Sequence, residues 1–430
     1  MHLLRVQVPD FRGLKNIDIS FEKDFFPKIF PLGSQNGGGK STLLQLIFVL
    51  LHCSVDEDRK PFIANMLQGF KIAEGEDKKV LAIIDIWDGE KNVKLEFYSY
   101  NNHYIKTILE LDSKEQTIDE DDICFSSLKS LENLNDYINE LKVINEKTHN
   151  QMLEALAYRE KFNTICNRII EYLDSNNMTY ICNYSDDRKS NDLGDKALLC
   201  HFNNIDRKKT EIFFKELSDK IFLAAPSTQV FLFLPPDSRK LLFRNSSDAD
   251  QNYYGILESA RSELQGLFTY DFLAVELLIE SFKAARDRDF KEAIKTGSYG
   301  NSYQTLINDL NLMLANKSIN LDEDFSGVNF KLYNNGETIE LYPEDLSHGE
   351  LKRLSIYVWL KSRNIKDAIV LMDEVEIAFH PDWQYQIISD LKEWAPSNQY
   401  ILATHSYELC QALTPAHVKE IEPKLIKQES

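Results

Sequence analysis

A glycine-rich loop between an apolar strand and an apolar helix is the feature that most constrains the fold of this chain. The apolar residues 28–32 lead into the sequence GSQNGGGKST, and an apolar segment continues from Ser41. Gly37, Gly38 and Gly39 allow the backbone to wrap tightly and to point its N–H groups at an anion. The positive end of the following helix adds to this preference. The sequence therefore predicts a phosphate-binding loop in an α/β protein.

The polar residues of this loop have distinct predicted roles. Lys40 can reach the β- and γ-phosphates of a nucleotide, and Ser41 can place its hydroxyl on Mg²⁺. The strict motif has its first glycine at position 34, where this chain has Ser34, with Gly33 one place earlier. This departure alters the entry turn, whereas the later part of the loop supplies most phosphate contacts. The predicted nucleotide-binding residues of the loop are Asn36, Gly37, Gly38, Gly39, Lys40, Ser41 and Thr42.

Two apolar strands near the C-terminus end in polar residues. Residues 368–372 and 399–403 are continuous apolar runs, which is typical of buried parallel strands. Asp373 and Glu374 follow the first run directly, and His405 lies two residues after the second. Because ligands gather at the carboxyl ends of parallel strands, we expect these residues to meet the phosphate loop. Asp373 can hold Mg²⁺ through water. Glu374 points the other way from the strand and can orient or deprotonate the attacking water, and His405 can contact the γ-phosphate or that water.

Alternative metal chemistry finds less support in the sequence. A zinc hydrolase built on Glu374 and His405 lacks a third ligand at suitable spacing. None of the six cysteines forms a C-x-x-C pair, so free thiols are the expectation. The acidic run 119–122 is expected to be a solvated loop or helix start.

Composition bounds the class of protein. A length of 430 residues predicts two to three domains, and 43% hydrophobic with 27% charged residues is ordinary for a globular protein. The longest apolar run, 43–51, is too short to span a bilayer. The N-terminal sequence MHLLRVQV reads as a strand and not as a signal peptide. We therefore expect a cytoplasmic protein without a membrane contact.

The net charge of −19 argues against a general nucleic-acid coat, because a duplex is itself polyanionic. Contact with DNA would need a local basic patch, for which the candidates are Arg239, Lys240, Arg244 and the segment 283–288. A solvated helix face or loop is the alternative for each of them. An acidic chain can equally be attracted to a basic partner protein.

Four motifs together resemble the ATP-binding cassette superfamily, in its soluble branch with the SMC, RecF and overcoming-lysogenization-defect ATPases. They are SQNGGGKST as Walker A, LSHGE (Leu346 to Glu350) as the signature, IVLMDE as Walker B and ATHS as the His switch. The turn at Phe11-Arg12-Gly13 is similar to that branch's entry, and residues 376–381 resemble its dimer-contacting loop. The resemblance covers the first ~110 and the last ~100 residues.

This resemblance implies an α/β fold, an ABC-type P-loop ATPase head with an antiparallel β subdomain and an inserted helical region. It also implies ATP and Mg²⁺ as cofactors and a homo-oligomer in which two heads sandwich two ATP molecules. Ser347 and Gly349 of one head would then cap the γ-phosphate held by Lys40 of the other. His348 stands where transporters have glycine, and Gln68 is the candidate for the branch's switch glutamine.

Hydrophobic periodicity divides the chain into further elements. Strands are expected at 2–8, 15–21, 79–87, 92–99, 103–111 and 221–234, helices at 128–144, 150–173 and much of 253–315, and a hairpin at 327–342. The signature is expected to open a helix over 351–362 and Pro381 to begin another. The predicted domains are an N-terminal ATPase lobe (1–116), a helical insertion (117–220), a strand plus helical subdomain (221–326) and a C-terminal ATPase lobe (327–430).

Within the branch, the sequence looks similar to the PtuA ATPase family of Septu anti-phage systems, which works with a separate HNH nuclease. The sequence continues for 25 residues after His405 and shows no HNH-like pattern, so we expect neither a Toprim nor an HNH nuclease domain in this chain. The preferred hypothesis is an ATP-hydrolysing subunit of a prokaryotic defence complex that regulates a separate nuclease subunit. The alternatives are a RecF-like repair ATPase that clamps DNA and a low-turnover nucleotide sensor or scaffold. A transporter subunit is disfavoured by the gap of about 300 residues between Walker A and the signature.

Overall fold

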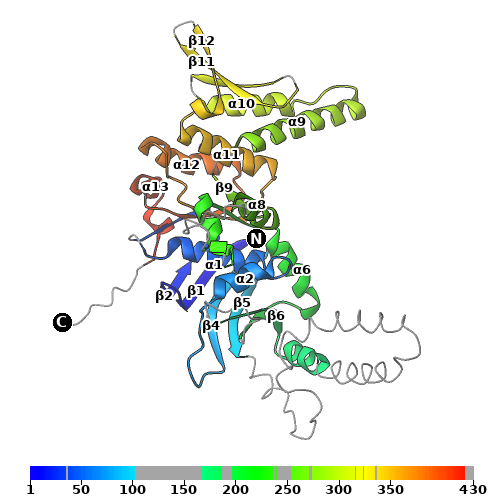
Figure 1. The fold of residues 1–430 in the computed structure, drawn as a ribbon, viewed down its shortest axis with the longest axis vertical. Coiled ribbons are helices and arrows are strands. Elements are labelled where there is room, and N and C mark those ends of the chain that lie inside the picture. The colour runs from blue at the N-terminus through cyan, green and yellow to red at the C-terminus, as the bar shows by residue number, and fades with distance from the viewer. Residues whose placement is uncertain are drawn as a thin grey trace, which may run out of the picture.

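Three β-sheets form the framework of the chain, with helices packed between and around them (Figure 1). In the described residues, one sheet is parallel, one is antiparallel, and a smaller antiparallel sheet lies at one end of the molecule. The computed structural model describes residues 1–34, 37–101, 166–185, 196–235, 238–239, 253–270, 274–314, 316–322, 324–334 and 337–421.

The parallel sheet carries the strand ends that the sequence singled out. Its strand order is β15-β3-β14-β13-β8-β9. All five residues of β13 and of β14 are buried, because the two faces of this sheet pack against different hydrophobic cores. Ile369 and Leu371 of β13 face one core, whereas Val370 and Met372 face the other. The strands are β3 Ile29–Gly33, β8 Ile221–Ala225, β9 Leu267–Thr269, β13 Ile369–Asp373, β14 Gln399–Ala403 and β15 Lys419–Glu420.

The larger antiparallel sheet has the order β2-β1-β4-β5-β7-β6. Its strands are β1 His2–Phe11, β2 Leu14–Ser20, β4 Lys78–Trp87, β5 Asn92–Asn101, β6 Met178–Tyr184 and β7 Lys196–Asn203. Alternating buried and half-buried positions in β5 are typical of a sheet with one face on a core. The predicted strand 103–111 lies outside the described residues. The partner of β5 in the structure is β7, which comes from about a hundred residues later in the chain.

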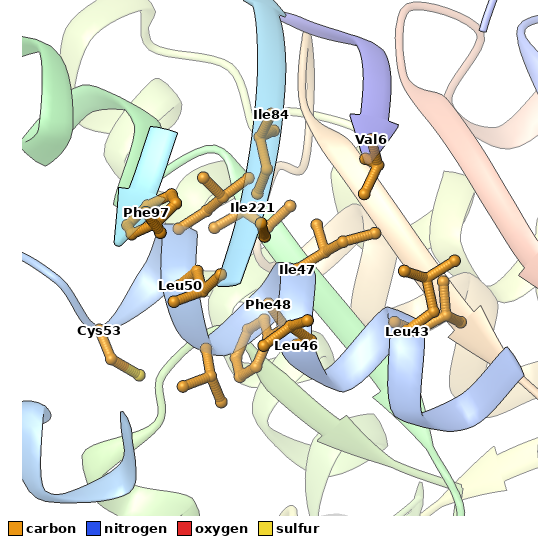
Figure 2. Packing of buried hydrophobic residues seen from close by; sticks show 14 of the residues in the cluster. Val6, Leu43, Leu46, Ile47, Phe48, Leu50, Cys53, Ile84, Phe97 and Ile221 are labelled. Carbon is orange, nitrogen blue, oxygen red and sulfur yellow. The ribbon is translucent and has the colours of Figure 1, made fainter. Parts of the chain in front are cut away.

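Helix α1 (Lys40–His52) lies between the two large sheets and fills the main core. Figure 2 shows Val6, Ile84 and Phe97 of the antiparallel sheet and Ile221 of β8 around this helix. The side chains that fill this core are at most 1% exposed; they are Leu43, Leu46, Ile47, Phe48, Leu50 and Cys53. A helix that is apolar on every side is stable only when it is surrounded in this way, and each such side chain contributes roughly 1.5–3 kcal/mol on burial.

Short helices surround this core. They are α2 Lys60–Leu67, α6 Arg207–Ser218, the 3₁₀ helix η3 Ser227–Phe233 and α8 Tyr253–Glu263. The prediction of a strand over 221–234 is wrong beyond residue 225. Pro226 has no N–H to donate to a neighbouring strand, and its carbonyl accepts from Gln229 to begin η3.

The C-terminal part packs on the other face of the parallel sheet. Trp359 of α11 stacks on Phe268 of β9 with ring centroids 4.8 Å apart. In Figure 1 the hairpin β11–β12, α10 and α9 form the upper end of the molecule above α11. The elements are α9 Ala274–Thr296, α10 Ser302–Met313, β10 Lys317–Leu321, β11 Val328–Asn334, β12 Glu337–Leu341, η4 Pro343–Asp345, α11 His348–Ser362, α12 Pro381–Trp394, α13 Tyr407–Gln411 and η5 Pro415–His417.

The local predictions for this part are confirmed in outline. The hairpin, the helix opened by the signature and the helix that begins at Pro381 are all present. The segment 253–315 is mostly helical but contains the short strand β9. Residues 166–175 are helical, as expected for the end of 150–173, while the rest of that helix and the helix 128–144 lie outside the described residues. Among the helices described, none combines the length and the hydropathy that a membrane span requires.

Candidate functional site

Lys40 is buried at the carboxyl edge of the parallel sheet, in a cluster of polar residues. Its Nζ donates to the carbonyl of Ser34 at 3.2 Å and to Oγ of Ser34 at 3.1 Å. The same Nζ lies 3.0 Å from Nε2 of His405, a residue 365 positions later in the sequence. Burial lowers the pKa of Lys40 below its usual value. Two predicted residues, Lys40 and His405, therefore meet inside one site.

The backbone of the loop is shaped by glycines. Gly39 is the N-cap of α1 and has a left-handed conformation with φ of 85°. This conformation favours glycine, and a Cβ atom there would lie 2.5 Å from Cδ2 of Leu14, so the leucine side chain would have to move. Gly37 is also left-handed, and Thr42 is half-buried in the first turn of α1. The predicted residue Asn36 lies outside the described residues.

Ser41 and Asp373 form the second pair of the site. The hydroxyl of Ser41 donates to Oδ1 of Asp373 at 3.0 Å, across 332 residues of sequence. Asp373 is 2% exposed, and its Oδ2 is buried without a hydrogen-bond partner. The pKa of Asp373 is raised to about 7, mainly by burial, while the bond from Ser41 lowers it and the neighbouring Glu374 and Glu376 add to the increase. A buried carboxylate oxygen without a donor beside a serine hydroxyl fits a hard divalent cation such as Mg²⁺.

The sequence analysis placed Glu374 at the end of the strand, with its side chain pointing away from that of Asp373. In the structure β13 ends at Asp373, and Glu374 is the first residue beyond the strand. It has a left-handed backbone with φ of 52°, which is uncommon for a residue with a side chain. Its N–H donates to the carbonyl of Ala403 at 3.0 Å. This bond fixes Glu374 between the two strand ends that carry Asp373 and His405. Its half-buried side chain is thereby kept at the same edge of the sheet.

Glu376 is a site residue that the sequence reasoning did not identify. Its Oε1 accepts from the backbone N–H of His405 at 2.7 Å, and its Oε2 is buried without a partner. It is 7% exposed. The available signal was a third acidic residue two positions after Glu374, in a segment assigned only to subunit contact.

Two glutamines border the site in different ways. Gln45 follows Ser41 by one helical turn on the same face of α1, and its Nε2 donates to Oε1 of Gln229 in η3. Oε1 of Gln45 has no partner. The predicted switch residue Gln68 lies at the C-cap of α2 with its Oε1 buried and unpartnered. Gln229, not Gln68, thus has a hydrogen-bond connection to α1 within the described chain.

Ser347 and Gly349 are not joined to this cluster. Ser347 is exposed and caps α11, with Oγ accepting from the N–H of Glu350 at 3.2 Å and donating to Oε2 of Glu350 at 2.9 Å. Gly349 is buried against the carbonyl of Ala378, which a Cβ would approach to 2.7 Å. Within the residues that the structure describes, no hydrogen bond connects Ser347 with Lys40 or the residues around it. The predicted site is therefore present as two separate groups.

Comparisons with known proteins agree with an ATPase at a general level. Residues 201–411 match the family described as "AAA domain, putative AbiEii toxin, Type IV TA system". The chain is 26% identical over 131 residues to "Retron Vc95 probable ATPase" of Vibrio cholerae serotype O1 biovar El Tor, covering 28% of this chain and 24% of that protein. It is 36% identical over 50 residues to "Retron Ec83 probable ATPase" of Escherichia coli, covering 12% and 9%. The chain thus spans at most about a quarter of the length of these relatives.

Solved structures of SMC heads align with most of the chain at low identity. The Smc head domain of Pyrococcus furiosus, bound to the C-terminal domain of ScpA, matches 96% of this chain and 91% of its own with 14% identity and a TM-score of 0.33. The SMC head domain from Thermotoga maritima matches 96% and 92% with 9% identity and a TM-score of 0.38.

The class that emerges is an α/β protein with a parallel sheet, an antiparallel sheet and a glycine-rich loop that opens a helix. This α/β fold was predicted from the sequence, is confirmed, and is consistent with an ABC-type P-loop ATPase head. More particularly, the family match and the retron relatives make the chain similar to AAA-type ATPases.

Proposed function

We propose that this chain binds and hydrolyses ATP at the cluster formed by Lys40, Ser41, Asp373 and His405. One observation carries the proposal: residues from three distant parts of the sequence meet at one edge of the parallel sheet through direct polar contacts. Within this cluster, Oδ2 of Asp373 is buried and has no hydrogen-bond partner. Such an atom is costly in a folded protein unless a ligand uses it.

The residues of the loop would bind the triphosphate. Lys40 would exchange its contacts with Ser34 and His405 for oxygens of the β- and γ-phosphates. The N-terminal end of α1 adds its positive dipole beneath them. Ser41 and Asp373 would hold Mg²⁺, which when bound neutralises charge on the phosphates.

Glu374 and His405 would act on the attacking water. Glu374 accepts its proton or orients it, and its backbone is fixed by the bond to Ala403. His405 contacts the γ-phosphate or the water, and Glu376 holds the backbone of His405 in place at 2.7 Å. Gln229 is the better candidate for a glutamine that monitors the site, because its partner Gln45 lies one turn from Ser41.

Two copies of the chain would complete the site. Ser347 is exposed, and its hydroxyl would exchange its bond to Glu350 for one to a ligand held by another molecule. We propose that Ser347 and Gly349 cap the γ-phosphate bound by Lys40 of a second copy. Turnover would then depend on how the copies meet.

The test of hydrolysis compares wild type with Glu374→Gln. Loss of the general base should reduce kcat by about 10²–10⁴-fold, while the Kd for ATP stays within about twofold. Glu393→Gln, on the exposed side of α12, is the matched control and should retain wild-type turnover. Equal kcat for wild type and Glu374→Gln would contradict the proposal and favour a nucleotide sensor.

We further propose a role in an anti-phage defence complex of the cytoplasm, in which ATP-dependent engagement regulates a separate HNH-type nuclease. The retron ATPase relatives and the toxin–antitoxin description of the matching family support a defence setting. The test is co-purification with the product of the adjacent gene, followed by nuclease assays with wild type and Lys40→Ala. Nuclease activity that is insensitive to ATP and to this substitution would contradict the proposal.

A DNA-clamping ATPase is the second candidate. Arg239, one of the predicted basic residues, donates to the carbonyls of Leu234 and Asn65 and is engaged within the fold. Arg286 on α9 pairs with Asp287, whereas Lys283 and Arg288 are exposed. Lys240 and Arg244 lie outside the described residues. Tight duplex binding by the isolated chain, with a steep decrease as salt rises, would favour this second function.

A further inference from the structure

Lys352 is a buried lysine on the second turn of α11. It is 6% exposed, which is rare for a lysine without a specific role. Its Nζ donates to the carbonyl of Glu374 at 2.8 Å and to the carbonyl of Ile377 at 3.2 Å. The ammonium also lies 4.0 Å from the centroid of the Tyr270 ring, within range of a cation–π contact. The helix that begins at the signature therefore reaches directly to the backbone of Glu374.

The segment that Lys352 contacts has an unusual backbone. Glu374 and Ala378 both adopt left-handed conformations, with φ of 52° and 71°. Residues with side chains hold such conformations only where the surrounding structure enforces them. Here the N–H of Glu374 donates to the carbonyl of Ala403, and the carbonyl of Glu374 accepts from Nζ of Lys352. The conformation of this turn, residues 374–378, therefore depends on α11 as well as on the parallel sheet.

A second contact from α11 reaches the same turn. Gly349 precedes Lys352 by three residues and so lies on the same face of the helix. Its Cα approaches the carbonyl of Ala378 so closely that a Cβ would lie 2.7 Å from it. Ser347, which caps this helix, lies two residues before Gly349. A shift of the helix start thus cannot occur without a change at the turn.

We propose that Lys352 is a positioning residue for Glu374, which links the placement of the signature helix to the geometry of hydrolysis. The proposal rests on the hydrolytic function proposed above. Lys352 acts on the main chain of Glu374 and leaves its carboxylate available for water. Its removal should therefore impair the chemical step and not the binding of nucleotide, because the contacts described for Lys352 are with Glu374, Ile377 and Tyr270.

The first experiment measures kcat and the Kd for ATP in Lys352→Met. We expect kcat to decrease at least about tenfold, since small displacements of catalytic groups have effects of this size, with Kd within about twofold of wild type. Lys361→Met, the same substitution at an exposed site on α11, is the control and should keep both constants. Lys352→Arg should recover part of the lost rate, because a guanidinium can donate to both carbonyls. A wild-type kcat in Lys352→Met would overturn the proposal.

A double-mutant cycle separates positioning from a merely structural role. If Lys352 acts through Glu374, then Lys352→Met should change the residual single-turnover rate of Glu374→Gln by less than about twofold. The same fold loss in both backgrounds would overturn the proposal while leaving the hydrolytic function intact. Identical turnover of wild type and Glu374→Gln would instead mean that the hydrolytic function itself fails. If Lys352→Met does not fold, Lys352→Gln takes its place in the cycle under the same criteria.

Discussion

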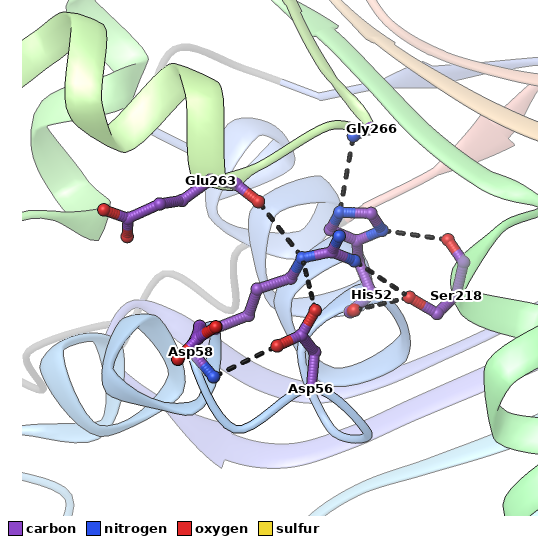
Figure 3. A network of polar contacts seen from close by, with 7 residues as sticks. His52, Asp56, Asp58, Ser218, Glu263 and Gly266 are labelled. Atoms are coloured by element: carbon purple, nitrogen blue, oxygen red, sulfur yellow. Dashed lines mark hydrogen bonds and ion pairs between the residues drawn. The ribbon is translucent and has the colours of Figure 1, made fainter.

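Helix α1 has a cluster of polar residues at each end. The two clusters differ in how many of their buried polar atoms have a hydrogen-bond partner. At its start, Oδ2 of Asp373 and Oε2 of Glu376 have none. At its end, His52 contacts Ser218 and Gly266 through both ring nitrogens, and Ser218 donates back to the carbonyl of His52 (Figure 3). The first cluster is therefore arranged for a ligand from outside the chain, whereas the second stabilises the fold.

The second cluster also includes charged groups. Arg59 donates to the carbonyl of Glu263 at 3.1 Å and to Oγ of Ser218 at 3.4 Å, and it pairs with Asp56 at 3.2 Å. These bonds connect α1, α6 and α8 behind the core. Substitutions at the start of α1 should therefore affect ATP binding and hydrolysis, and substitutions at its end should affect the stability of the fold.

The largest expected effect is that of Lys40→Ala. The loss of the buried ammonium that we propose to contact two phosphates should weaken ATP binding about a thousandfold, or about 4 kcal/mol. Isothermal titration calorimetry with ATP and Mg²⁺ measures this, and Lys15→Ala, at an exposed lysine of β2, is the control. Retained affinity in Lys40→Ala would mean that the nucleotide binds elsewhere.

The next effect concerns acid stability at the other end of α1. Burial lowers the pKa of His52 to about 4, from an ordinary 6.5. Protonation would place a hydrogen on Nε2, which now accepts from the N–H of Gly266. The stabilisation is complete above pH 6.5 and is lost as pH falls towards 4, by about 3 kcal/mol in total.

Urea unfolding between pH 7 and 4 tests this prediction. His52→Gln should be less stable than wild type at pH 7 and should lose less stability on acidification. His348→Gln, at an exposed histidine, should follow the wild-type pH profile. An unchanged pH profile in His52→Gln would show that the cluster at the end of α1 does not titrate as described.

A third prediction concerns the separate group at the start of α11. Ser347→Arg puts a bulky cation at an exposed cap and should block engagement of a second copy, so kcat should decrease about tenfold or more. ATP binding should change less than about threefold, because Ser347 has no hydrogen bond to the Lys40 cluster in the described chain. Ser362→Arg, at the exposed end of the same helix, is the control. An unchanged kcat in Ser347→Arg would mean that no composite site forms.

The smallest expected effect is a gain of stability. Asp373→Asn removes a buried carboxylate with an unpartnered oxygen, and it should raise the free energy of unfolding by about 1 kcal/mol while hydrolysis is lost. Thermal unfolding without nucleotide or Mg²⁺ measures this gain. The exposed Asp58→Asn should leave stability unchanged. A less stable Asp373→Asn would mean that this carboxylate serves the fold, which removes the contrast between the two ends of α1.

Local sequence patterns were sufficient for the elements that carry the site. The glycines before Lys40, the Ser347 capping box and the apolar runs before Asp373 and His405 each depend on neighbours within a few residues. Backbone conformation, helix capping and burial of whole strands follow from such neighbours. The strand predicted at 221–234 ends at residue 225, because Pro226 has no N–H to donate to a neighbouring strand.

Sequence patterns thus predict which residues end strands and open helices, and hence which of them could form a nucleotide site. How these residues contact one another depends on the tertiary structure. The parallel register that pairs Asp373 with Ala403 sets the turn at Glu374, and the contacts of Glu376 with His405 and of Lys352 with Glu374 depend on it. Side chains far apart in sequence meet only after sheets and helices have packed. No periodicity or spacing records which partner a buried polar atom will find, or that it will find none.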